Sequence, residues 1–222
     1  LVLCCYRSSS FINRWECLNT GWVCFGCVSP SKQSLAVKKK LRNRMVQQKF
    51  DYFLVVDFEA TCEENKKIQP VQEIIEFPVC QIDAHSLDEI DRFHQYVRPT
   101  ENQFLTSFCS NLTGIVQETV DKSNTLPLVL EDFDKWLFSR GLLNSDGTNS
   151  RSWIMVTCGD WDLGVQLPQE AEYRGLNEWI NMKKAFSEAL GHYPNSLSTM
   201  LQDLGIEPVV CVSFPLFQII FG

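Results

Sequence analysis

Runs of apolar residues bounded by turn signals divide the middle of the chain into strands and helices. Segment 52–58 contains four consecutive apolar residues, a pattern typical of a strand buried on both faces. Two further strands are predicted over 73–82 and 90–97, and their close succession favours antiparallel pairing because parallel pairing needs a longer crossover. A second apolar run over 153–159 predicts another buried strand.

Helical spacing of apolar residues follows these strands. Segment 105–112 predicts a short helix that ends at Gly114, and 126–138 predicts a longer one. After the last strand, helices are predicted over 179–190 and 197–204. Strands first and helices afterwards predict an α/β fold, with a mixed sheet whose first three strands are antiparallel and with helices on both faces.

Acidic residues stand where the two buried strands end. Asp57 and Glu59 are one residue apart, so on an extended chain their side chains point to the same side. Asp162 follows the second buried run, and the three carboxylates converge if the two strands are neighbours. Hard divalent cations bind such oxygens, and paired ions stabilise attacking and leaving oxygens in phosphoryl chemistry. The pattern predicts metal-dependent phosphodiester cleavage; the alternative is an ordinary solvated acidic pair.

Trp161 and two further acidic residues, Glu73 and Glu76, have two interpretations each. Trp161 offers a flat surface on which a base stacks, or it is a core aromatic residue that anchors the strand. Glu73 and Glu76 flank an apolar stretch of the second strand, and we interpret them as structural or rim residues.

Charge and cysteine content set the first 49 residues apart from the remainder. Residues 1–50 hold nine of the twenty Lys and Arg residues but only one of the twenty-seven acidic ones, and five of the ten cysteines precede residue 30. We predict a disordered, basic, Cys-rich leader over 1–49, in which the basic run 38–44 is a nuclear-import signal, a backbone-binding arm or a solvated linker. Cys24 and Cys27 form half of a zinc motif without a matching second pair. The remaining cysteines are scattered, which is typical of reduced thiols in an intracellular protein.

Six motifs in order resemble one family of nucleases. They occupy 57–62, 72–78, 96–99, 112–115, 158–162 and 179–181, within residues 50–207. Together they resemble the histone-mRNA 3′-exonuclease and enhanced-RNAi (ERI) family of the DnaQ-like (DEDDh) 3′-5′ exonucleases.

The resemblance implies an RNase H-like fold, two Mg²⁺ or Mn²⁺ ions, and stepwise release of nucleoside 5′-monophosphates from RNA 3′ ends. It implies that Asp57, Glu59 and Asp162 are catalytic metal ligands and that Glu59 also faces the terminal ribose. It further implies an incomplete exonuclease domain over 50–207, cytoplasmic or nuclear location, RNA 3′ ends as partners, and an RNA-binding protein in trans as a further partner. We expect no membrane association, because the apolar stretch at the end of the chain is too short to span a bilayer. The remaining substrate-binding residues that the resemblance implies are Ala60, Thr61, Leu112, Thr113 and Trp161.

One departure from the family shapes the expected activity. In the family, a His that acts as general base and an Asp that completes the metal site follow the segment matched here by 201–206. In this sequence an apolar tail, 208–222, follows instead. We therefore expect a truncated form without the C-terminal helix and with impaired exonuclease activity; the alternative is a catalytically inactive isoform that binds RNA ends or a protein.

Overall fold

The computed structural model describes residues 48–173 and 178–206. The predictions for the tail over 208–222, for the Cys24 and Cys27 pair, and for nearly all of the leader over 1–49 lie outside the described residues. No helix in the two described ranges has the length and apolar character needed to cross a membrane.

A six-stranded mixed sheet forms the centre of the described structure, and the apolar runs predict four of its strands, β1, β3, β4 and β5. Strand β3 pairs antiparallel with both β1 and β4, which confirms the predicted antiparallel arrangement. Strand β5 pairs parallel with β1, with Leu54 opposite Met155. The strand order is β2-β3-β1-β5-β6, with β4 paired to β3. The strands are β1 (Tyr52–Val56), β2 (Glu59–Ala60), β3 (Ile74–Asp83), β4 (Glu89–Tyr96), β5 (Trp153–Thr157) and β6 (Trp179–Asn181).

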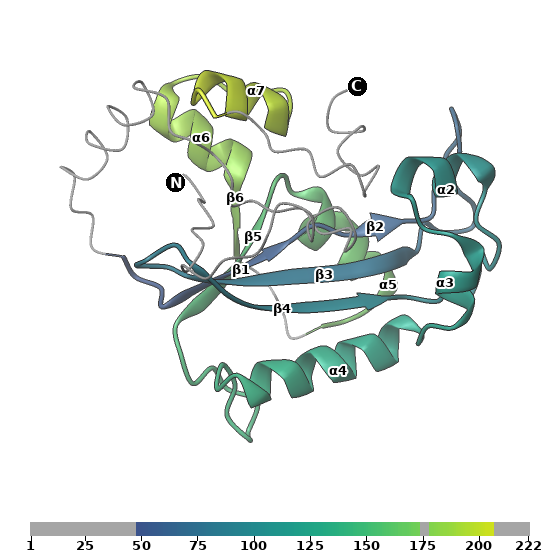
Figure 1. Ribbon diagram of the computed structural model, residues 1–222, viewed down its shortest axis with the longest axis horizontal. Helices are drawn as coiled ribbons and strands as arrows, with labels where there is room; N and C mark the ends of the chain where they lie inside the picture. The colour runs from purple at the N-terminus through teal and green to yellow at the C-terminus, as the bar shows by residue number, and fades with distance from the viewer. Residues whose placement is uncertain (1–47, 174–177, 207–222) are drawn as a thin grey trace, which may run out of the picture.

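Both faces of the sheet are covered because β1 is apolar at every position. Leu54 and Val56 lie in the main core, together with Phe133 of α4 (Leu126–Ser139). Phe53 lies in a second core cluster, against which Met182 at the start of α6 (Met182–Leu190) packs. Figure 1 shows α4 along one side of the sheet, and α6 with α7 (Leu197–Asp203) along the other. The predicted α/β fold with helices on both faces is confirmed.

Helix α2 (Ser107–Thr113) has well-defined ends. The Thr106 hydroxyl caps the start and accepts a hydrogen bond from the Cys109 N–H at 2.9 Å. Gly114 ends the helix with φ of 72°, a left-handed conformation that favours glycine. The predicted helix is therefore confirmed, displaced by one or two residues at its ends.

The prediction of a helix over 179–190 is wrong in its first three residues. These residues form β6, which pairs parallel with β5 and places Asn181 opposite Thr157. The helix begins only at Met182, where the Asn181 side chain accepts a hydrogen bond from the Lys184 N–H at 3.1 Å. Sheet pairing thus outweighs the helical spacing of the apolar residues. Three short helical elements are absent from the sequence-based prediction: α3 (Gln117–Asp121), the π-helical turn η1 (Asp162–Gln166) and α5 (Leu167–Glu170).

Candidate active site

The three acids singled out from the sequence come from neighbouring parts of the sheet. Asp57 directly follows β1, Glu59 opens β2, and Asp162 opens η1. Asp162 lies beyond the end of β5, which stops at Thr157, so it belongs to a helical turn and not to the strand end itself. Its Oδ1 accepts a hydrogen bond of 2.9 Å from the backbone N–H of Phe58, the residue between the other two acids. This contact ties η1 to the segment that carries Asp57 and Glu59.

Electrostatics show that these acids share one environment. Desolvation first, then the charges of Asp162 and Glu76, raise the pKa of Asp57 to about 7. Desolvation, followed by Asp57, Glu76 and other neighbours, raises the pKa of Glu59 to about 9. Desolvation also raises the pKa of Asp162, although the Phe58 N–H opposes it. Because burial disfavours the charged forms and the charges of neighbouring acids add to this at Asp57 and Glu59, the ion-free site holds protons more tightly than free carboxyl groups do.

The donor set fits a hard divalent cation. Carboxylate oxygens are the ligands that Mg²⁺ and Mn²⁺ prefer, and a cation would offset the burial and the repulsion that raise these pKa values. Within residues 48–173 and 178–206, no group of three or more His, Cys, Asp or Glu side chains is already arranged to hold an ion. The fit therefore rests on donor chemistry and charge, and the deprotonated side chains must approach one another when an ion binds.

A fourth carboxylate, Glu76, lies beside the site. It is on β3 directly opposite Glu59 and is only 3% exposed, so a rim position is wrong for this residue. His94 Nε2 lies 2.6 Å from Glu76 Oε1, whereas Oε2 is buried without a hydrogen-bond partner. Its charge raises the pKa of both Asp57 and Glu59. The register between β2 and β3 brings it there, and the sequence alone carries no signal of that register.

Glu73, by contrast, has the structural role expected of it. Its carboxylate accepts backbone N–H hydrogen bonds from Thr100 at 2.6 Å, Glu101 at 3.0 Å and Asn102 at 2.6 Å. Burial alone would raise the pKa of Glu73, but these hydrogen bonds lower it below its ordinary value. The side chain therefore fixes the loop that leads into α2.

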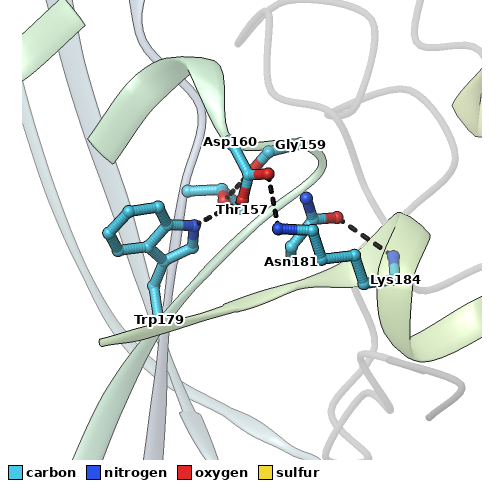
Figure 2. Close-up of polar contacts among 6 residues, drawn as sticks. All are labelled: Thr157, Gly159, Asp160, Trp179, Asn181 and Lys184. Carbon is cyan, nitrogen blue, oxygen red and sulfur yellow. Dashed lines mark hydrogen bonds and ion pairs between the residues drawn. The ribbon is translucent and has the colours of Figure 1, made fainter. Parts of the chain in front are cut away.

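A polar network holds the turn that precedes Asp162 (Figure 2). The Asp160 carboxylate accepts a hydrogen bond from Trp179 Nε1 at 3.1 Å and pairs with Lys184 Nζ at 2.7 Å. Gly164 of η1 packs on the same indole ring, since a Cβ at this position would lie 3.1 Å from Trp179 Cζ2. Strand β6 and the start of α6 thus position η1, and with it Asp162.

The residues predicted to bind substrate differ in exposure. Trp161 is 38% exposed, which fits stacking better than a core role. Ala60, Thr61 and Thr113 are buried, and both threonine hydroxyls already form hydrogen bonds with the backbone. Leu112 is partly exposed. Nucleotide contact at Ala60 and Thr61 therefore requires the backbone, with the side chains as support.

Comparisons with known proteins agree on one family. A sequence model of the Exonuclease family matches residues 54–209. Bos taurus ERI1 exoribonuclease 3 is 45% identical over 169 residues, which cover 73% of this chain and 48% of the relative. Homo sapiens 3′-5′ exoribonuclease 1 is 35% identical over 191 residues, covering 77% of this chain and 53% of the relative. The chain spans about half the length of these curated relatives.

Solved structures give the same result. The nuclease domain of 3′hExo, a DEDDh family member bound to rAMP, is 34% identical with a TM-score of 0.64, over 72% of this chain and 82% of that one. A structure described as 3′-end specific recognition of histone mRNA stem-loop by 3′-exonuclease is 33% identical with a TM-score of 0.66. The match covers 78% of this chain and 62% of that chain. These similarities confirm the predicted RNase H-like fold. The chain belongs to the Exonuclease family, as a DEDDh member of its ERI and histone-mRNA 3′-exonuclease branch.

Proposed function

We propose that this protein is a metal-dependent 3′-5′ exoribonuclease that releases nucleoside 5′-monophosphates from RNA 3′ ends. The observation that carries the proposal is that the charges of Asp57, Glu59 and Asp162 act on one another, with Asp162 held by the Phe58 N–H between the other two acids. Relatives whose names describe exoribonucleases, and a related structure bound to rAMP, support the choice of RNA.

Asp57, Glu59 and Asp162 would hold Mg²⁺ or Mn²⁺. When bound, the ions supply charge stabilisation for the attacking and leaving oxygens of the scissile phosphate. The protein supplies the geometry: the Phe58 N–H fixes one oxygen of Asp162, which leaves its other oxygen for the site. Burial of Asp162, which is 5% exposed, also strengthens every charge interaction there.

The terminal nucleotide would lie against the segment that links β1 to β2. Ala60 and Thr61 are buried, so any contact that they make with the ribose or phosphate would come from their backbone. Trp161 would stack on a base, and the end of α2, at Leu112 and Thr113, would contact the last bases. Contacts through aromatic faces and backbone favour RNA ends of many sequences.

The decisive experiment is an RNA degradation assay on the chain as printed, with an oligoribonucleotide labelled at its 5′ end. We expect Mg²⁺-dependent shortening from the 3′ end with nucleoside 5′-monophosphate as product, and no shortening in chelator. Asp162→Asn should abolish release, since a neutral amide is a poor ligand for a hard cation. Asp146→Asn, at an exposed loop position, is the matched control and should leave release unchanged. RNA retention without any release would contradict the proposal and would support a non-catalytic RNA-end-binding function.

A further inference from the structure

Two cysteines from separate elements meet beside the candidate site. Cys62 follows β2 and is half-buried, whereas Cys109 belongs to the first turn of α2 and is fully buried. Both are free thiols, and their side chains form a hydrogen bond with each other. The Cys62 backbone N–H also bonds to the Cys109 sulfur, which in turn lies 3.7 Å from the Ala60 carbonyl oxygen.

The backbone holds this pair together independently of the thiols. The Thr106 hydroxyl donates to the Cys62 carbonyl oxygen at 2.8 Å and accepts from the Cys109 N–H at 2.9 Å. Cys62 also packs against the small core cluster that contains Cys109 and Ile75. A single side chain therefore bridges the two backbone segments that carry the cysteines.

The hydrogen bond between the thiols favours a thiolate. The Cys62 side chain lowers the pKa of the Cys109 thiol to about 7, and the pKa of Cys62 is raised in turn. The two sulfurs then share one proton near neutral pH, and the thiolate is the nucleophilic form. Burial instead raises the pKa of Cys80 to about 11, so Cys80 is a suitable comparison.

We propose that Cys62 and Cys109 form a reversible disulfide when the protein meets a peroxide. The Cys109 thiolate takes the shared proton from Cys62, and the Cys62 sulfur, on the half-buried side, attacks one peroxide oxygen; the O–O bond breaks, a sulfenic acid forms on Cys62, and the other oxygen takes a proton from solvent and leaves as water. The Cys109 thiol then attacks the Cys62 sulfur, the S–S bond forms, and the sulfenic oxygen takes the Cys109 proton and leaves as a second water. Two thiols are oxidised and one peroxide is reduced to two waters. A dithiol reductant reverses the reaction.

The effect of this disulfide on RNA cleavage rests on the proposed function. A disulfide draws the two sulfurs to about 2.05 Å, closer than any hydrogen bond between thiols. The bond would pull α2, which ends at Leu112 and Thr113, toward the segment that carries Glu59 and Ala60. Because displacement of positioning residues by about 1 Å lowers rates strongly, we expect oxidation to slow cleavage by at least about tenfold.

Peptide mapping tests the bond without reference to activity. The reduced protein is treated with hydrogen peroxide, free thiols are blocked, and trypsin is added. Cleavage at Lys and Arg places Cys62, Cys80 and Cys109 in three different peptides, 50–66, 68–92 and 93–122. We expect a linked species of 50–66 with 93–122 that separates again in dithiothreitol. Linkage of either peptide only to other cysteines, or no linkage at all, would overturn the proposal.

Single variants separate the disulfide from general oxidation. Cys62→Ser and Cys109→Ser should each lose the linked species and keep cleavage after peroxide treatment, whereas Cys80→Ser should behave like the unmodified chain. If peroxide slowed both variants as much as the parent, the bond would not be the cause and the regulatory part of the proposal would fail. If the reduced protein released no nucleotide, the proposed function would fail while the mapping still decided whether the disulfide forms.

Discussion

Replacing Asp57 with Asn is expected to stabilise the ion-free protein and to abolish RNA cleavage. Burial and the nearby acids raise the pKa of Asp57 from 3.8 to about 7, so the folded state binds its proton more tightly than the unfolded state does. This contribution favours folding fully below about pH 4 and is lost as the pH rises through about 7. Asn removes the charge and keeps the shape, so the variant should be the more stable protein at about pH 8.

The magnitude follows from the same shift. Each tenfold change in proton affinity corresponds to about 1.4 kcal/mol, so the full displacement would cost the folded state about 4 kcal/mol. Asp57 keeps solvent-exposed surface, and screening by solvent reduces that figure. We therefore expect Asp57→Asn to add about 1–2 kcal/mol to the free energy of unfolding at about pH 8.

Thermal unfolding in the presence of a chelator measures this gain. For a chain of this size the midpoint should rise by about 2–8 °C at pH 8 and should not change at about pH 4. Asp146→Asn, in an exposed loop, should leave the midpoint unchanged at both pH values. Added Mg²⁺ should stabilise the parent but not Asp57→Asn, since only the parent retains the ligand. A variant that unfolds at or below the parental temperature at pH 8 would refute the reasoning that burial and the nearby acids together disfavour the Asp57 carboxylate.

Three further variants test how the site is positioned. Glu73→Ala removes the acceptor for the backbone N–H groups of residues 100–102. It should lower the free energy of unfolding in urea by about 2–4 kcal/mol and speed amide hydrogen exchange in that loop alone. Unchanged amide exchange in the loop would contradict the structural role of Glu73. Gly164→Ala places a Cβ 3.1 Å from Trp179. The variant should therefore lower the RNA cleavage rate several-fold and the free energy of unfolding in urea by about 1 kcal/mol. An unchanged cleavage rate and an unchanged free energy of unfolding would show that η1 needs no close packing. Trp161→Ala should weaken RNA binding by about 1–3 kcal/mol in a fluorescence anisotropy titration without altering the melting temperature; equal affinity would exclude base stacking.

The sequence predicts the sheet well where burial is uniform. The apolar runs of β1 and β5 identify two strands that lie side by side, and this adjacency brings Asp57 near Asp162. The spacing of apolar residues predicts the wrong element where strand pairing decides between a strand and a helix. Trp179 begins a strand and not a helix because β5 offers it a partner, and α3 has only one buried residue, Val120, so it shows no periodicity.

Neighbours from distant parts of the sequence account for the rest of the site. Glu76 faces Glu59 only through the register of β2 and β3, which a single sequence does not reveal. The Cys62 and Cys109 pair likewise depends on how α2 packs against the end of β2. Residue types predict the chemistry of the acids, whereas the surrounding charges and burial become known only from the fold.

Titration of the protein with Mn²⁺, followed by electron paramagnetic resonance of the free ion, tests most directly whether Asp57, Glu59 and Asp162 form one ion site. We predict saturable binding to the parent chain and an affinity lower by at least about tenfold in Asp162→Asn. Equal affinity in the parent and in Asp162→Asn would contradict the claim that the three carboxylates act together.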